Sequence, residues 1–257
     1  MPFSPTIERW RGAVDSLNRI MDTDPFLANM IPESGGIPGR IGYFDTGSSY
    51  TDEEIACGLD PKWRRRALGL CQVAPGTLRS YNSKKAIGGM SSGSTTPWFK
   101  PVTPCQLAGT SSADALEQIR VGLYVWANCL FWSAGTANVK WQPDQLMPDE
   151  ILLMTRLRYH RGNGAVNKKL DQAAAAGFPR TFAGLEAFDP DWGKPDRPFH
   201  GARIVLASYK KAMGASTPTP SEPPIDWPTP PTNGGGSGGA AIAILALLLI
   251  FAFSRKR

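Results

Sequence analysis

Apolar residues recur at the spacing of amphipathic helices over most of residues 1 to 214, and this pattern predicts a mostly α-helical domain. Ser4 and Pro5 suit a helix cap and a first turn, and an apolar face follows them over about 15 residues. Asp24 with Pro25 begins a second helix, whose apolar side chains lead toward Glu33. Pro32 lies within this second helix, so we expect a kink or the helix end beside Glu33. The first apolar face consists of Ile7, Trp10, Val14, Leu17 and Met21.

The longest periodic stretch lies in the middle of the chain, where Ser112 suits an N-cap and Gly135 a helix stop. Pro148 begins another helix, which Gly162 and Gly164 break, and residues 166 to 176 resume a helix. A last helix is expected from about Pro198 to Met213. The middle helix should bury one face in the core, formed by Leu116, Ile119, Leu123, Trp126 and Leu130.

Residues 34 to 66 lack this helical period. Tyr43, Phe44 and Asp45 lie between turn signals, which predicts a short hairpin or an ordered loop. Thr51 precedes three acidic residues and should cap a short helix, and Asp60 with Pro61 should begin another. Residues 83 to 112, rich in Ser, Gly, Thr and Pro, are too long for a simple connection.

A change in composition after residue 214 divides the chain into a domain, a linker and an anchor. Residues 215 to 239, dominated by Pro, Thr and Gly, predict an extended linker. Residues 240 to 253 are apolar throughout and three basic residues end the chain, which predicts one transmembrane helix within residues 240 to 257. A helix over residues 240 to 253 reaches only about 21 Å of a hydrocarbon core of about 30 Å, so spanning would rely on uncharged flanks and snorkelling basic ends. The basic end is expected on the side opposite the domain.

The charge balance favours an anionic partner. The chain has 28 Lys and Arg against 22 Asp and Glu, a net charge of +6, which suits a cell-wall polymer or lipid headgroups. Nucleic acid is not an expected partner, because the basic residues are scattered and no reader motif is present.

The cysteines and histidines show no metal-binding spacing. There is no CxxC pair and the two histidines are isolated, so we expect neither a metal site nor a cofactor. The even count permits two disulfides, although Cys71 and Cys129 lie in apolar runs where a buried thiol is the usual state. The four cysteines are Cys57, Cys71, Cys105 and Cys129.

Glu33 is the candidate catalytic acid. Apolar residues precede it and glycines follow, so its carboxyl can lie against an apolar wall that raises its pKa and keeps it protonated near neutral pH. Such an acid donates a proton to a leaving oxygen. Taken alone, the residue is more simply an ordinary helix end beside a Gly-Gly turn. Two further motifs favour the catalytic interpretation.

Three segments, in this order, resemble motifs of the soluble lytic transglycosylase and goose-type lysozyme family. Glu33-Ser34-Gly35 resembles the family's Glu-Ser motif. Gly69-Leu70-Cys71-Gln72-Val73, with Pro75 and Thr77, resembles its Gly-Leu-Met-Gln motif. Tyr159 with Gly162, Gly164 and Val166 resembles its Tyr-Asn-x-Gly motif. The resemblance covers about residues 26 to 170.

This resemblance implies a mostly α-helical, lysozyme-like fold with a minor hairpin and a cleft that binds peptidoglycan glycan strands. It implies that Glu33 is the only essential carboxylate, which protonates the oxygen between N-acetylmuramic acid and N-acetylglucosamine. Ionised Glu33 would then take the proton of the muramyl C6 hydroxyl, and a 1,6-anhydro ring would close. Carried over by position, Ser34 supports Glu33, Gln72 contacts the acetamido sugar, and Tyr159 orients the carboxylate or the intermediate.

The sequence departs from the family pattern at His160, Arg161 and Asn163 and in Pro32 before the acid. The span from Glu33 to Gly69 is also longer than the family pattern. A carboxylate from this longer loop could activate water, which would make the protein a hydrolytic muramidase. The candidates for that second carboxylate are Asp45, Asp52, Glu53 and Glu54.

Two other classes of function compete with the enzyme: a non-catalytic wall-binding virion protein of the same fold, and a protein that uses its positive charge on nucleic acid or a membrane surface. The presence of Glu33, Gln72 and Tyr159 favours the enzyme. Charged residues close to Met1 predict that there is no secretory signal peptide. With its apolar tail, the chain resembles virion-associated transglycosylases of membrane-containing phages, which open the host wall during genome entry. Virion proteins would be further partners, and a bacterial cell envelope is the alternative location.

Overall fold

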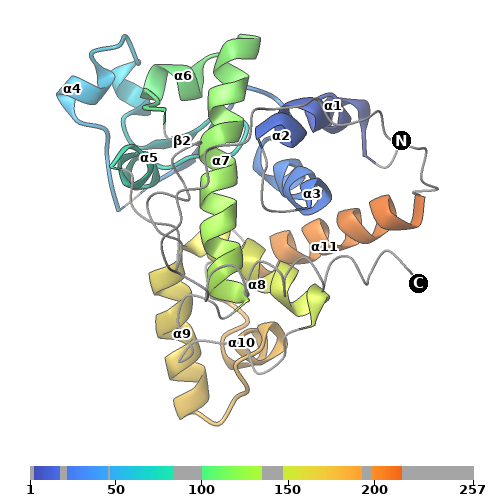
Figure 1. The fold of residues 1–257 in the computed structure, drawn as a ribbon. Helices are drawn as coiled ribbons and strands as arrows, with labels where there is room; N and C mark the ends of the chain where they lie inside the picture. Colours follow the sequence, from blue (N-terminus) through green and yellow to red (C-terminus); the bar gives the residue numbers. More distant parts are fainter. Residues whose placement is uncertain are drawn as a thin grey trace, which may run out of the picture.

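The structure, a computed structural model, describes residues 3–17, 22–45, 47–83, 100–134, 147–192 and 198–215, and these residues form a mostly helical fold (Figure 1). The prediction of a mostly α-helical protein is confirmed. The elements up to residue 83 are α1 (Pro5–Glu8), α2 (Arg11–Leu17), α3 (Thr23–Ser34), β1 (Ile41–Phe44), α4 (Asp52–Ile55), the 3-10 helix η1 (Pro61–Trp63), β2 (Arg66–Leu68) and α5 (Pro75–Asn82). The later elements are α6 (Pro104–Ala108), α7 (Ser112–Ser133), α8 (Pro148–Arg161), α9 (Asn163–Ala175), α10 (Phe182–Phe188) and α11 (Pro198–Ala215).

Helix α3 carries Glu33 in its last turn. The helix begins after Asp22, whose side chain accepts a hydrogen bond from the backbone N–H of Asp24, as an N-cap residue does. Pro32 lies inside the helix without ending it. The end comes after Ser34, where Gly35 adopts a φ of 65° that a residue with a side chain reaches only with strain. The predicted helix end beside Glu33 is therefore confirmed.

Helix α7 runs through the middle of the fold (Figure 1). Its N-cap is Ser111, whose side chain accepts from the N–H of Asp114, one residue before the predicted cap. Helix α8 packs against both α7 and α11, and α11 also packs against α3. This arrangement holds the end of α3 near α8.

The buried apolar side chains form two clusters. The first cluster lies around α3 and α7, and the second lies among α8, α9, α10 and α11. Helices α8 and α11 contribute to both, since Leu152 and Val205 belong to the first cluster while Leu157 and Ala202 belong to the second. The largest fully buried side chains of α3 and α7 include Phe26, Leu27, Met30 and Trp126.

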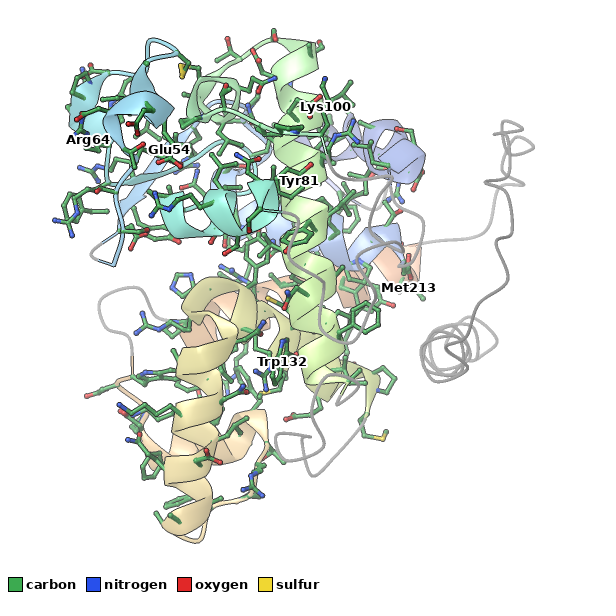
Figure 2. All side chains as sticks on the ribbon, turned by 60° about the vertical axis from the view of Figure 1, so that its left-hand side comes forward. Glu54, Arg64, Tyr81, Lys100, Trp132 and Met213 are labelled. Carbon is green, nitrogen blue, oxygen red and sulfur yellow. A yellow bond between two sulfur atoms is a disulfide. The ribbon has the colours of Figure 1, made fainter. Side chains whose placement is uncertain are left out.

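A small antiparallel sheet follows α3. Strands β1 and β2 pair with Ile41 opposite Leu68 and Phe44 opposite Arg66. A short hairpin or an ordered loop was expected at Tyr43 and Phe44, but the two strands are separated by α4 and η1 and form no short hairpin. Helix α5 packs against α7, and the ring of Tyr81 on α5 stands edge-on to Tyr124 on α7 at 5.3 Å. The Tyr81 hydroxyl also donates to the carbonyl oxygen of Lys100, 3.1 Å away (Figure 2).

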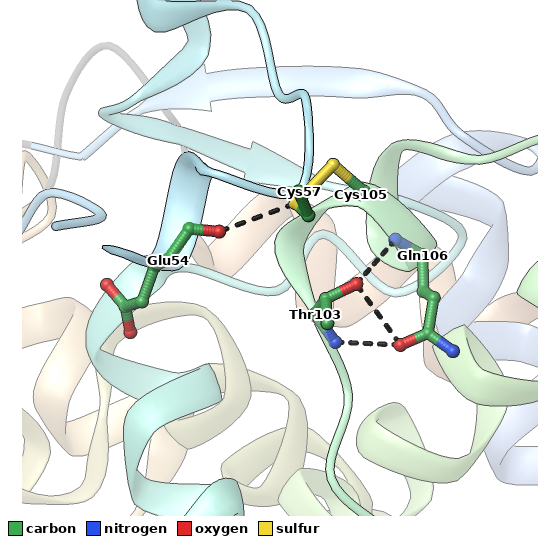
Figure 3. Close-up of a disulfide and its surroundings, with 5 residues drawn as sticks. All are labelled: Glu54, Cys57, Thr103, Cys105 and Gln106. Atoms are coloured by element: carbon green, nitrogen blue, oxygen red, sulfur yellow. Dashed lines mark hydrogen bonds between the residues drawn. A yellow bond between two sulfur atoms is a disulfide. The ribbon is translucent and has the colours of Figure 1, made fainter. Parts of the chain in front are cut away.

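A disulfide joins Cys57, just after α4, to Cys105 in α6 (Figure 3). Beside it, Thr103 and Gln106 form a capping box at the start of α6. Cys71 and Cys129 are free and buried, so one of the two permitted disulfides exists and both expected buried thiols are confirmed.

Some helices differ from the sequence prediction. The expected N-terminal helix is two short helices, α1 and α2, which separate at Arg9 and Trp10. Trp10 donates its indole N–H to the carbonyl oxygen of Gly36. This tertiary contact stabilises the separation of α1 from α2. Leu116 was expected in the core but is 38% exposed. Helices α5, α6 and α10 were not predicted, because each is short and lacks a repeated apolar period.

Within the described residues, no helix is both long enough and apolar enough to cross a membrane. The predicted linker beyond residue 215 and the predicted span over residues 240 to 253 lie outside those residues, as do Met21 and the predicted helix stop at Gly135.

Candidate active site

Glu33 is buried at the end of α3, with a residue exposure of 8%. Its apolar surroundings were expected from Phe26, Leu27, Met30 and Ile31, of which the first three are fully buried on the same helix and Ile31 is half-buried. Burial raises the pKa of Glu33, and the positive charge of Arg156 acts in the opposite direction. The predicted direction of the pKa shift, and its cause, are therefore found in the structure.

Arg156 is the ionic partner of Glu33 and was not among the predicted site residues. Its Nη1 atom lies 2.5 Å from Oε1 of Glu33, and the side chains are 5% and 4% exposed. Arg156 precedes Tyr159 by three positions on α8, so the two side chains share one face of the helix. A charged residue inside the apolar run from Ile151 to Leu157 was the sequence signal that could have identified it.

Tyr159 connects two of the motif segments. Its hydroxyl donates a hydrogen bond to the carbonyl oxygen of Cys71, 2.7 Å away. Its ring centroid lies 5.9 Å from the guanidinium carbon of Arg156. Burial raises the pKa of Tyr159 well above its usual value, and the negative charge that ionised Glu33 would carry raises it further. Tyr159 is therefore an uncharged hydroxyl close to both members of the ion pair.

Gln72 is held in place by backbone groups. Its φ of 50° lies in the left-handed region, and its amide Nε2 donates to the carbonyl oxygens of Arg40 and Gly69 at 3.1 and 2.8 Å. The side chain passes over Gly42, where a Cβ atom would lie 1.2 Å from its Oε1. Because its amide donors are engaged, what Gln72 offers a ligand is at most its carbonyl oxygen.

Ser34 is fully buried and supports the loop after Glu33. Its hydroxyl oxygen accepts a hydrogen bond from the backbone N–H of Gly36 at 3.1 Å. Arg40 reaches back to the carbonyl oxygen of Ser34 at 3.0 Å. These contacts fix the chain directly after Glu33, and the supporting role of Ser34 in the reaction stays a prediction.

A cleft of about 570 Å³ lies beside Tyr159. Its walls come from β1 with the residue after it, from α5, from α7, and from the junction of α8 and α9, and they include Tyr43, Phe44, Asp45, Asn128, Tyr159 and Asn163. Of the predicted site residues, Tyr159 lines this cleft, whereas Glu33, Ser34 and Gln72 are buried and are absent from its wall. Tyr159 therefore lines the cleft and is also close enough to Glu33 for the Glu33 charge to act on its hydroxyl.

The cleft carries charge of both signs. Arg158 and Arg161 line it together with one carboxylate, Asp45. His160 also lines it, and burial followed by the charges of Arg156 and Arg161 lowers its pKa to about 3, so this histidine is neutral at physiological pH. Exposed Tyr43 lies against it with a ring separation of 6.2 Å.

Asp45 is the one candidate second carboxylate that faces the cleft. Its Oδ1 accepts from the backbone N–H of Gly47 at 2.7 Å and its Oδ2 from the hydroxyl of Ser48 at 2.5 Å. Asp52 pairs with Arg64, and Glu54 pairs with Arg79 at 3.0 Å. Asp52, Glu53 and Glu54 all belong to α4 and are absent from the cleft wall.

Among the described residues, no group of His, Cys, Asp or Glu has the arrangement of a metal site. Comparison with protein-family models, with curated proteins and with solved structures found no match to this chain. The chemistry of the site must therefore be argued from its own geometry.

Proposed function

We propose that this chain is a peptidoglycan lytic transglycosylase with a lysozyme-like fold, and that Glu33 is its catalytic acid and base. The observation that carries the proposal is the buried Glu33 carboxyl, with a raised pKa, beside a tyrosine that lines a cleft. A raised pKa suits a carboxyl that must be protonated near neutral pH before it reacts. The order of the three motif segments supports the same assignment.

In the first step, Glu33 donates its proton to the oxygen between N-acetylmuramic acid and N-acetylglucosamine. The bond from C1 to that oxygen breaks, and the acetamido carbonyl of the muramyl sugar assists at C1. The leaving sugar departs with the proton, and Glu33 is left ionised.

In the second step, the Glu33 carboxylate removes the proton of the muramyl C6 hydroxyl. The C6 oxygen bonds to C1, the acetamido group is released, and a 1,6-anhydro ring closes. Glu33 ends protonated as it began, and the reaction consumes no water. Glu33 is absent from the cleft wall in the structure, so the proposed reaction needs the glycosidic oxygen to come within reach of a buried carboxyl.

Asp45 favours one alternative, a hydrolytic muramidase. Its carboxylate lies at the cleft wall, where it could hold a water molecule for attack at C1. A retaining or inverting hydrolase of this kind uses two carboxylic groups, one as acid and one as base or nucleophile. Glu33 and Asp45 would then share the work that the transglycosylase assigns to Glu33 alone.

Mass spectrometry of the muropeptides released from purified sacculi tests the proposal. We expect fragments that end in 1,6-anhydromuramic acid. Fragments heavier by about 18 Da, the mass of one added water, would assign the reaction to hydrolysis instead. No released fragment from any wall type, with a folded protein, would overturn both enzyme proposals.

We also propose that residues 240 to 253 anchor the enzyme in a membrane, with a virion membrane as the setting and a bacterial cell envelope as the alternative. The support is the apolar run itself, followed by its basic end. Flotation with liposomes should carry the full chain upward and leave a truncation to residues 1–232 at the bottom of the gradient. Equal behaviour of the two chains would contradict the anchor.

A further inference from the structure

The ion pair between Arg156 and Glu33 is nearly closed to solvent. Both side chains are at most 5% exposed, and the charged atoms lie 2.5 Å apart. The Nε atom of Arg156 is also buried and has no hydrogen-bond partner among the described residues. In the described part of the chain, the close polar contact of the guanidinium is its ion pair with the carboxyl of Glu33.

The charged and titratable groups around Glu33 come from few elements. Arg156 and Tyr159 approach from α8, and Cys71 approaches from the turn after β2. Helix α11 faces the pair with Gly201, where a Cβ atom would lie 3.5 Å from Nη2 of Arg156. Tyr159 and Cys71 are both neutral at physiological pH, because burial raises the pKa of each. The positive charge of Arg156 is thus the one that bears directly on the carboxyl in this part of the structure.

We propose that Arg156 is a positioning residue that orients the Glu33 carboxyl and stabilises its ionised form between the two steps of the reaction. This inference rests on the proposed function of Glu33. When Glu33 gives its proton to the glycosidic oxygen, a buried carboxylate is left behind, and an unpaired buried carboxylate is costly. Arg156 compensates that charge until the C6 hydroxyl returns a proton. The charge of Arg156 itself does not change at any step, since a guanidinium stays protonated.

Burial and Arg156 act on Glu33 in opposite directions, and both directions are needed. Burial alone would keep the carboxyl neutral, which suits an acid but makes a poor base after the first step. Arg156 alone would keep it ionised, which suits a base but not an acid. A carboxyl that must serve as acid and then as base needs the two influences together.

The first test measures the pKa of Glu33 directly and does not depend on activity. Carbon-13 NMR of the folded full chain, labelled at glutamate carboxyls, gives the titration, and the signal lost in Glu33→Gln identifies the residue. Arg156→Gln should raise the pKa of Glu33 by about one unit or more, because an opposite charge within 4 to 6 Å shifts a carboxyl by this amount. Arg203→Gln removes the same charge from an exposed pair between Arg203 on α11 and Glu186 on α10, and it should leave the pKa of Glu33 unchanged. An unchanged pKa in Arg156→Gln would overturn the proposal.

The second test is the pH dependence of glycan cleavage. Activity requires protonated Glu33 and should fall as the pH rises through its pKa. In Arg156→Gln the fall should move to higher pH, while the maximal rate drops by roughly tenfold or more. A purely structural role would lower the rate equally at every pH and would leave the pH at which activity decreases unchanged. That result would refute the positioning role.

A conservative variant keeps the test valid if Arg156→Gln does not fold. Arg156→Lys keeps the positive charge on a shorter and less directional group, so the pKa of Glu33 should rise less than one unit and the maximal rate should recover in part. A pKa equal to that of the wild type together with a rate as low as in Glu33→Gln would contradict charge stabilisation. If Arg156→Gln shifts the pKa but the wild type cleaves no wall, the proposed function fails while the ionic coupling stands.

Discussion

The hydroxyl of Tyr159 donates a hydrogen bond to the carbonyl oxygen of Cys71 across a sequence separation of 88 residues. This bond ties the third motif segment to the second, and the charge of Glu33 acts on both Tyr159 and Cys71. The same tyrosine ring faces Arg156 and, at 5.8 Å, the ring of Trp126 on α7. One side chain therefore belongs at once to the cleft wall, to the core and to the surroundings of the carboxyl.

Tyr159→Phe should lower both stability and activity. Loss of one buried hydrogen bond costs about 1 kcal/mol of unfolding free energy. Cleavage of sacculi should fall by roughly tenfold or more, because the hydroxyl that orients the site is removed. Tyr50→Phe is the matched control, since Tyr50 also donates to a backbone carbonyl, that of Val73 at 3.3 Å, but does not line the cleft. If both variants lose equal stability and equal activity, Tyr159 has no special role.

Glu33→Gln should abolish activity, with a loss of about 10² to 10⁴-fold or more, because one group serves as acid and base. Asp45→Asn should keep most of the wild-type rate. Turbidity clearing of sacculi would compare the two. A loss in Asp45→Asn as large as in Glu33→Gln would instead support the hydrolytic alternative.

The Glu33→Gln variant needs a folding control. Removing the carboxylate leaves Arg156 as an unpaired buried charge, which costs roughly 3 to 5 kcal/mol. Activity should therefore be compared at a temperature where circular dichroism shows both proteins folded. Full activity in the folded variant would exclude Glu33 as the catalytic group.

Gly42→Ala should displace the side chain of Gln72. A Cβ atom at residue 42 would meet Oε1 of Gln72 at 1.2 Å, so the amide must leave its hydrogen bonds to Arg40 and Gly69. We expect a loss of about 1 to 3 kcal/mol in urea unfolding, as for other overpacked sites. Gly12→Ala on α2 meets no atom within 4 Å and should be neutral or stabilising. Equal stability of the two variants would show that Gln72 relocates at no cost.

His160 should make the fold sensitive to acid. Its pKa in the folded protein is lowered to about 3 from a usual value of 6.5, so the unfolded chain binds the proton more readily. The stability that neutral His160 contributes is complete above the usual pKa and is lost as the pH falls from 6.5 toward 3. Urea unfolding at about pH 7 and about pH 4.5 should show a smaller loss in His160→Gln than in the wild type. His200→Gln, at an exposed position on α11, should lose as much as the wild type.

The disulfide should make the wild type sensitive to reduction. It closes a loop of sequence separation 48, and the chain-entropy relation gives about 4 kcal/mol for a loop of that length. Dithiothreitol should lower the melting temperature of the wild type but not that of a Cys57→Ser/Cys105→Ser double variant. Alkylation after denaturation without reductant should label Cys71 and Cys129 alone. Labelling of all four cysteines under those conditions would contradict the disulfide.

Local signals in the sequence were sufficient for several parts of the fold. The capping residues Thr51 and Asp60, the proline at the start of α8 and the helix end beside Glu33 all follow from short-range chemistry, and the structure agrees. The break between α1 and α2 could not be read in the same way, because it depends on Trp10 reaching Gly36. Such a contact between distant segments leaves no periodic trace in the chain.

The candidate site shows the same division. The sequence located Glu33 and predicted the direction of its pKa shift, because both depend on neighbours along α3. It did not identify Arg156 as the ionic partner, since that contact depends on α3 and α8 both packing against α11. The sugar contact expected for Gln72 stays a prediction, and the structure adds that its amide donors hold the turn after β2.

Helices α8 and α11 each place side chains in both apolar clusters, as Leu152 and Leu157 do for α8. Unfolding of either cluster would therefore expose one apolar face of a helix that also contributes side chains to the other cluster. The domain should consequently melt in a single cooperative transition, with calorimetric and van't Hoff enthalpies that agree. A cavity opened at Phe182 in the second cluster should lower the same midpoint as one opened at Phe26 in the first. The two walls of the cleft should therefore unfold in the same transition, although separate groups of apolar residues support them.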